Sequence, residues 1–170
     1  MRDGTEQEYV DYVSARIPAL RRLAFLLAGD EHRADDLVQQ TITTLYVKWR
    51  RARAADRIDA YVRTMLVRTY LSERRLAWTR VRLFREAPEP PPFEDHGVEE
   101  RQVVRAALSQ VPRRQRAVLV LRFYHDLPVD EVAEMLGCSP GTVKSQTSRG
   151  LATLRRLLGE RELATYSAVN

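Results

Sequence analysis

The sequence is poor in features that secreted and membrane proteins need. It has one cysteine, Cys138, so an internal disulfide is excluded and a reducing, cytoplasmic location is favoured. It has no apolar run long enough to cross a bilayer, and the residues after Met1 lack the apolar core of a signal peptide. We therefore expect a cytoplasmic protein without membrane insertion.

Signals of catalysis and of metal binding are missing as well. The sequence has no glycine-rich phosphate loop, no paired-histidine metal motif and no nucleophile elbow. His32, His96 and His125 are scattered, and none has a cysteine or another histidine at ligand spacing. Asp35 and Asp36 are adjacent, so on a helix their side chains point about 100° apart and cannot share one proton or metal. The sequence predicts no cofactor and no enzymatic activity.

Acidic and basic residues are separated along the chain, whose net charge is +5. Residues 1–47 carry five basic and eight acidic residues, whereas residues 48–85 carry twelve basic and three acidic ones. Residues 86–97 carry four acids and no basic residue. This separation indicates a polyanionic partner for the basic block and a protein partner for an acidic one. Solvated, arginine-rich helix faces are the alternative explanation of the charge alone.

Apolar residues recur at three- and four-residue steps in the first half of the chain, which predicts three helices. A capping-box pattern at Thr5–Glu8 predicts the start of the first helix, Gly29 its end, and Pro18 a kink or a split within it. Asp30 is expected to cap the second helix. The third helix is expected over residues 59–76.

A proline cluster set among acids, at positions 88, 90, 91 and 92, predicts an extended linker over residues 84–97. The linker separates an expected domain at residues 1–83 from a second one at residues 98–170. Further helices are expected at residues 99–111, 112–124, 129–136 and 140–158. The fold class predicted is therefore all-α, with two small helical domains joined by a proline-rich acidic linker.

The last two of these helices match the spacing of a helix-turn-helix. Ala133 is the small residue where the two helices touch, Gly137 accepts the positive φ of the turn, and Val143 packs the second helix against the first. Ser139 is expected to cap the second helix. The pattern predicts a DNA-binding motif, with a basic helical hairpin that packs against protein as the alternative.

The outward face of the second helix carries small polar and basic residues and no acid, which suits the major groove of DNA. On a helical wheel, Lys144, Ser145 and Arg149 point where base edges would lie. Arg155 and Arg156 follow on the same side, where they would contact phosphates.

Several segments resemble extracytoplasmic-function (ECF) sigma factors of bacterial RNA polymerase. Gly141–Leu151, preceded by Leu127–Ala133 and Val111–Arg116, resembles domain 4 of that family. Leu23–Asp30 and Ala34–Thr41 resemble domain 2. The most similar group is the SigE-like actinobacterial one. The resemblance implies a sigma factor that binds core RNA polymerase, directs it to promoters and promotes transcription initiation.

The resemblance also implies which residues meet which partner. Domain 4 would read the −35 promoter element through Thr142, Lys144, Ser145, Ser148, Arg149, Arg155 and Arg156. Domain 2 would dock on the clamp helices of the largest polymerase subunit through Asp35, Asp36, Gln39 and Gln40. The basic third helix and the loop before it would capture the −10 element through Arg53, Arg63, Arg68, Ser72, Arg74 and Arg75.

Two positions depart from the family pattern on the −10 helix, where Arg68 replaces a common Asn and Ser72 a common Asp. The identity of the selected −10 base therefore does not follow from the resemblance. Four aromatic residues of this region, Trp49, Tyr61, Tyr70 and Trp78, have side chains able to stack on unpaired bases. Burial in the core is the expectation for Trp49 and Tyr61, and the other two are open.

The partners expected are core RNA polymerase, including its flap for domain 4, promoter DNA and an anti-sigma factor, with a monomeric free chain. Two alternatives differ in class. One is a self-sufficient helix-turn-helix regulator, which needs a dimerisation element that the sequence lacks. The other is a sigma mimic that sequesters an anti-sigma protein without touching DNA.

Overall fold

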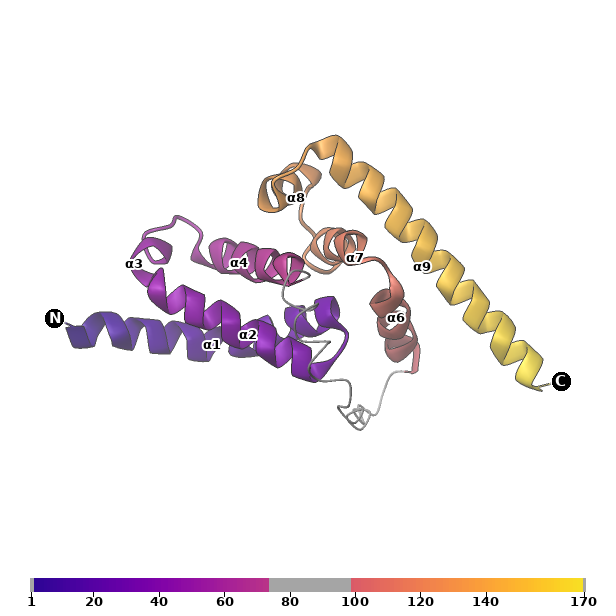
Figure 1. Cartoon of the computed structure of the whole chain (residues 1–170), viewed down its shortest axis with the longest axis horizontal. Helices are drawn as coiled ribbons and strands as arrows, with labels where there is room; N and C mark the ends of the chain where they lie inside the picture. Colours follow the sequence, from indigo (N-terminus) through magenta and orange to yellow (C-terminus); the bar gives the residue numbers. More distant parts are fainter. Residues whose placement is uncertain (1, 74–98, 170) are drawn as a thin grey trace.

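The structure is a computed structural model that describes residues 2–73 and 99–169, with side chains for residues 4–73 and 101–160. Every regular element in these ranges is a helix, as the sequence predicts (Figure 1). None of the described helices is both long and apolar enough to cross a membrane. The expected linker at residues 84–97 lies outside the described residues.

Four helices form the N-terminal domain: α1 (Arg2–Ala28), α2 (Glu31–Val47), α3 (Trp49–Ala52) and α4 (Ile58–Ser72). Helices α1 and α2 pack along each other, and α4 packs on both, so that a continuous apolar core forms between them (Figure 1). Leu37, Leu45 and Leu66 are fully buried in that core. Trp49 is buried as expected, with 6% of its surface exposed, whereas Tyr61 is only partly buried.

The start of α1 differs from the sequence prediction. The helix begins at Arg2, so Thr5 lies inside it and does not cap it, and Pro18 does not split it. A threonine in a helix interior costs only a few tenths of a kcal/mol, about 0.7 at most, so the capping pattern did not stop the helix from extending. The other end of α1 agrees with the prediction, because Gly29 follows it with a φ of 76°.

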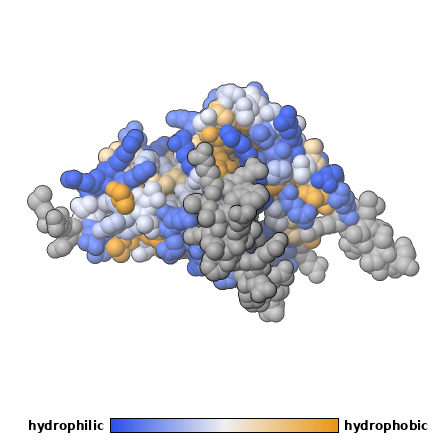
Figure 2. All heavy atoms as spheres, viewed as in Figure 1, coloured by the Kyte–Doolittle hydropathy of each residue, from blue (hydrophilic) through white to orange (hydrophobic). Residues whose placement is uncertain are grey.

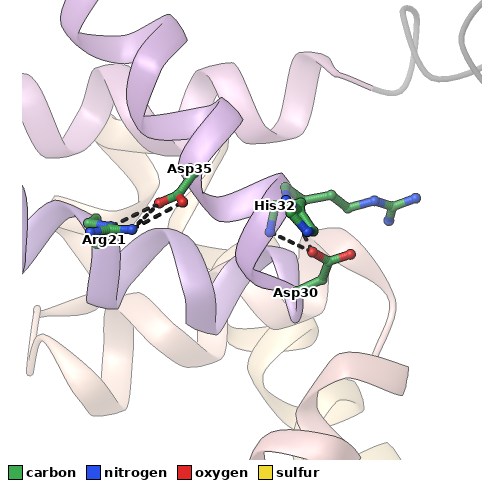
Figure 3. A network of polar contacts seen from close by, with 5 residues as sticks. Arg21, Asp30, His32 and Asp35 are labelled. Carbon is green, nitrogen blue, oxygen red and sulfur yellow. Dashed lines mark hydrogen bonds and ion pairs between the residues drawn. The ribbon is translucent and has the colours of Figure 1, made fainter. Parts of the chain in front are cut away.

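The capping of α2 is confirmed. The carboxylate of Asp30 accepts hydrogen bonds from the backbone N–H groups of His32, at 2.7 Å, and Arg33, at 3.2 Å (Figure 3). These bonds satisfy two of the amides that a helix start leaves without partners. The turn at Gly29–Asp30 therefore fixes the direction in which α2 leaves α1.

A polar cluster anchors α4 to α1. Asp59, in the first turn of α4, accepts a hydrogen bond from the Tyr12 hydroxyl at 2.8 Å and pairs with Arg16 at 2.8 Å. Burial, followed by the hydrogen bond to Asp59, raises the pKa of Tyr12, so its hydroxyl stays a donor at physiological pH. This cluster holds the basic helix α4 in a fixed orientation.

The C-terminal domain consists of α6 (Glu99–Gln110), α7 (Arg113–Leu119), a π-helical turn (Val120–Tyr124), α8 (Val129–Leu136) and α9 (Pro140–Val169). Helix α9 contacts α6, α7 and α8 and runs the length of the domain (Figure 1). It ends eleven residues later than predicted, because a single Gly159 costs a helix only about 1 kcal/mol and good helix formers follow it. On the face shown in Figure 2 hydrophilic residues predominate, and apolar residues gather in the upper middle of the view and in smaller groups elsewhere.

Candidate DNA and polymerase interfaces

The helix-turn-helix predicted from the sequence is present in α8 and α9. Gly137 has φ 63° and ψ 40°, the left-handed conformation expected of it. The amides of Gly137 and Cys138 donate to the carbonyl oxygens of Glu134, at 3.2 Å, and Ala133, at 3.0 Å, which closes the end of α8. Ser139 Oγ accepts a hydrogen bond from the Thr142 N–H at 3.1 Å, which confirms the predicted cap. The short helix α8 and the long helix α9 are thereby joined by a defined turn.

Close packing sets the position of α9. Val143 is fully buried, and Ala133 is 4% exposed. Gly150 lies so close to α7 that a Cβ atom on it would come within 3.0 to 3.3 Å of three Leu119 side-chain atoms. Because protein interiors are densely packed, a larger residue at position 150 would push α9 away from its support. The inward residues thus fix which side of α9 faces outward.

The outward face of α9 agrees with the helical-wheel prediction. Lys144, Ser145, Ser148 and Arg149 are exposed along its first three turns, and Arg155 and Arg156 follow, also exposed. Thr142 is half-buried, and its hydroxyl lies 2.9 Å from Ser139 Oγ. Arg156 pairs with Glu160 at 3.0 Å, a partner that lies just beyond the helix end expected from the sequence. The rest of the face is open to a ligand.

The candidate docking strip lies on α2, at the opposite end of the sequence. Asp36 and Gln39 are exposed, whereas Gln40 is half-buried. Asp35 forms a two-pronged ion pair with Arg21 of α1, at 2.8 and 3.0 Å (Figure 3). This pair uses part of the acceptor capacity of Asp35, so Asp36 and Gln39 are the best placed to meet a partner.

The −10 candidates that the structure describes do not form one open basic face. Arg53 pairs with Glu8 of α1 at 2.7 Å. Arg63 is half-buried, and Ser72 Oγ donates to the Thr69 carbonyl at 2.9 Å. Arg68 donates through Nε to the carbonyl of Met135, in the other domain, at 2.8 Å. Arg74 and Arg75 lie outside the described residues.

A groove of about 680 Å³ runs beside α4. Three basic residues of the N-terminal domain, Lys48, Arg57 and Arg68, line it, and α8 contributes Glu131 and Glu134. Sequence reasoning missed Lys48, and it placed Arg57 at the end of the −10 loop without naming it as a site residue. The groove thus brings basic residues of two segments, before and within α4, to one hollow.

Stacking on an unpaired base requires an exposed ring, and the candidate aromatic residues differ in their exposure. Tyr70 is 1% exposed, so stacking on an unpaired base is excluded for it in this conformation. Burial raises the pKa of its hydroxyl, and Arg113 lies over its ring at 4.2 Å from the centroid. Trp78 lies outside the described residues. Tyr61 lines the groove and retains a partly exposed ring.

His125, next to the π-helical turn, is buried enough to lower its pKa to about 4, and the charge of Arg63 adds to this effect. A histidine with a lower pKa in the folded state binds more protons when unfolded. The free energy of unfolding should therefore fall as the pH drops from about 6.5 towards 4, by about 1–2 kcal/mol once solvent screening is allowed for.

We expect a His125→Gln variant to lose this part of the pH dependence in urea unfolding measured at pH 7.5 and pH 5. A His32→Gln variant is the matched control, because His32 is exposed. The assignment is wrong if wild type and His125→Gln lose the same stability between the two pH values.

Family models of sigma factor domains match a segment in each half of the chain. Residues 101–154, which contain α8 and the first half of α9, match the family model for region 4 of sigma-70. Residues 13–58 match the family model for the sigma2 domain of PhyR. Among solved structures, the sigma factor RpoE from Bartonella quintana, in complex with the anti-sigma factor NepR, superposes with a TM-score of 0.73. Its sequence is 25% identical, and the match covers 90% of this chain and 98% of that one.

Relatives that match over most of their own length are RNA polymerase sigma factors. The RNA polymerase sigma-E factor of Streptomyces avermitilis is 34% identical over 96% of this chain and 92% of its own length. The sigma-E factor of Streptomyces coelicolor is 35% identical over 94% of this chain and 91% of its own length. An ECF RNA polymerase sigma factor, EcfG of Rhodopseudomonas palustris, is 29% identical over 87% of this chain and 83% of its own length. The helix-turn-helix, the all-helical fold and these matches agree: the chain belongs to the ECF family of RNA polymerase sigma factors.

Proposed function

We propose that this sigma factor binds core RNA polymerase, directs it to promoters with −35 and −10 elements, and thereby promotes transcription initiation. The observation that carries the proposal is the exposed basic face of α9, the second helix of a helix-turn-helix whose inward residues Ala133 and Val143 are buried. Such a helix inserts into the major groove and reads base edges. A separate acidic strip on α2 supplies a surface for a protein partner.

The −35 element is the proposed target of α9. Lys144, Ser145 and Arg149 are placed to reach base edges, because they are exposed on the early turns that enter the groove. Ser148 lies beside them, and Thr142 contributes through the first turn. Arg155 and Arg156 are placed to contact phosphates, which position the helix without reading sequence.

Helix α2 is the proposed contact with the clamp helices of the largest polymerase subunit. Asp36 and Gln39 would make the direct contacts, and Asp35 and Gln40 would border them. An acidic and amide surface favours an arginine-bearing protein and disfavours DNA. Domain 4 would contact the polymerase flap in the same assembly.

The groove beside α4 is the proposed site for the unpaired −10 strand. Arg68, Arg57 and Lys48 supply cations for its phosphates, and the ring of Tyr61 supplies a stacking surface. Arg53, Arg63, Ser72, Arg74 and Arg75 would extend this contact. The chemistry of RNA synthesis belongs to the polymerase, and this chain supplies location and strand capture.

Three finer assignments belong to the same proposal. The domains are residues 1–83 and 98–170, with a linker at residues 84–97. The functional group proposed is the SigE-like actinobacterial one, which the two Streptomyces relatives favour. An anti-sigma factor is a proposed partner, because the Bartonella quintana sigma factor was crystallised with one.

A sigma mimic that sequesters an anti-sigma protein is the second candidate, since residues 13–58 match the sigma2 domain of PhyR. A mimic of that kind does not bind DNA, so it does not require an exposed helix that reads base edges. The exposed Lys144, Ser145 and Arg149, together with the sigma-70 region 4 match, favour the DNA-binding function.

Transcription from a randomised promoter library separates the two candidates. With core polymerase and this chain, the productive templates should share two sequence blocks at a fixed spacing. Core polymerase alone is the control, and a chain lacking α9 residues 140–158 is a second one. A library that yields no transcripts, while the chain binds an anti-sigma protein, would establish the mimic instead.

A further inference from the structure

A cavity of about 610 Å³ lies between α1, α2, α6 and the π-helical turn. Helix α6 contacts α1, so residues of both domains line this cavity (Figure 1). Its volume falls within the range of about 300–1,000 Å³ that is typical of sites for small molecules. Of its lining residues, the proposed function uses only Asp35. The chemistry of the lining therefore indicates which kind of ligand the cavity fits.

Half of the lining is apolar or aromatic. These residues are Pro18, Phe25 and Leu26 of α1, Ala34 of α2, and Tyr124. Phe25 and Leu26 are half-buried, whereas Tyr124 is 51% exposed. A flat apolar molecule gains free energy both from leaving water and from packing against such rings.

The backbone around Tyr124 is unusual. Tyr124 is the last residue of the π-helical turn, in which the N–H of His125 donates to the carbonyl of Val120 at 3.1 Å. Asp126 follows with a φ of 51°, and it is the one described residue other than glycine that has a positive φ. Turns of the π type are rare and occur frequently at functional sites. This observation does not depend on the cavity, and it indicates the same place.

Three arginines and two acids line the cavity, which leaves an excess of one positive charge. Arg21 and Asp35 neutralise each other in their two-pronged ion pair (Figure 3). Glu31 lies in the first turn of α2, where the helix dipole favours a carboxylate. Arg22 and Arg105 are exposed, and none of the described acidic side chains pairs with either of them. Both cations are available to an anionic ligand.

Arg105 connects the cationic and the apolar parts of the cavity. Its guanidinium carbon lies 5.5 Å from the centroid of the Phe25 ring, a cation–π contact. The N–H donors of a guanidinium lie in its plane, where they match the paired oxygens of a carboxylate or a phosphate. One small molecule with a ring and an anionic group can therefore contact Arg105 and the aromatic wall together.

We propose that this cavity binds a small molecule that carries a planar ring and one phosphate or carboxylate group. The anionic group pairs with Arg105 and Arg22, and the ring packs against Tyr124 and Phe25. Because Arg22 and Phe25 belong to the N-terminal domain and Arg105 and Tyr124 to the C-terminal one, the ligand contacts both domains. The site is separate from the surfaces assigned above to promoter DNA.

Fluorescence titration of the full chain with 1-anilinonaphthalene-8-sulfonate tests the site, because this probe combines planar rings with one anionic group. The neutral control probe is 1-N-phenylnaphthylamine, which has the same rings without the sulfonate. We expect Arg105→Met to weaken binding of the anionic probe about fivefold or more and to leave binding of the neutral probe unchanged. Arg101→Met is the matched control, since Arg101 is exposed on the same helix outside the cavity.

A second variant tests the aromatic wall. Tyr124→Ala should weaken binding of both probes about fivefold or more, because the loss of a stacking surface does not depend on the charge of the ligand. Phe123→Ala is the matched control, since Phe123 is an exposed aromatic residue of the same turn that does not line the cavity. Circular dichroism should show equal helix content in all four variants.

Competition against the anionic probe identifies the anionic group. Adenosine monophosphate offers a ring with a phosphate, and 1-naphthoate offers a ring with a carboxylate. Displacement by either competitor, weakened about fivefold or more in Arg105→Met, supports the site and names its ligand class. Equal binding of the anionic probe to wild type, Arg105→Met and Tyr124→Ala would show adsorption to apolar surface only and would overturn the site. Failure of both competitors to displace the probe would overturn it as well.

Discussion

Replacing Asp36 and Gln39 together by arginine is expected to abolish binding to core RNA polymerase, with a loss of affinity of more than about 100-fold. Both side chains are exposed on α2, so the change leaves the core of the N-terminal domain untouched. Two new cations would face the arginine-bearing surface proposed for the polymerase clamp. Like charges brought together at an interface cost several kcal/mol, which corresponds to a loss of this size.

The measurement is the affinity of labelled chain for purified core enzyme at fixed ionic strength. Asp11→Arg with Ser14→Arg is the matched control, because these exposed residues of α1 have the same spacing and their replacement makes the same change in charge. Circular dichroism should show unchanged helix content in both variants. If the Asp36 and Gln39 variant binds core enzyme as tightly as the control, the docking assignment is wrong.

Changing Arg149 to alanine should weaken binding to cognate −35 duplex by about 10- to 100-fold, or about 1–3 kcal/mol. Arg149 is exposed on α9, and none of the described acidic side chains pairs with it, so its guanidinium is available to a base edge. A two-pronged contact to a guanine is the most common specific contact that an arginine makes in the major groove. The loss should be confined to the cognate sequence.

The experiment compares competition binding of holoenzyme to promoters with cognate and scrambled −35 blocks. Arg155→Ala is the control, since the proposed phosphate contact predicts an equal loss on both sequences and a salt dependence weaker by about one charge. An equal loss on both sequences for Arg149→Ala would reassign that residue to the phosphates.

The first helix and the turn of the helix-turn-helix could be predicted to the residue because their signals are local. Gly137 must adopt a positive φ, Ser139 must cap, and Val143 must face inward, and each of these requirements depends on near neighbours in sequence. The observed bounds of α8, Val129–Leu136, are the predicted ones. The cap at Asp30 was also predicted correctly, because it depends only on the residues that follow it in sequence.

Contacts between distant residues could not be predicted in this way. Nothing near Asp35 in sequence indicates that Arg21 neutralises it, because that pair forms only when α1 and α2 pack. Arg68 was correctly placed on the basic helix, but its bond to Met135 spans two domains. Tyr70 was left open between stacking and burial, and the packing of α4 decided for burial.

The central claim is that the two domains bind two separate promoter elements at the same time, with polymerase between them. Run-off transcription from one selected promoter tests it most directly, with the −35 block scrambled, the −10 block scrambled, or five base pairs inserted between them. We predict that each change removes most of the transcript, since an insertion of half a helical turn rotates one element away from its domain. Undiminished transcription after scrambling the −35 block or after the insertion would contradict the account.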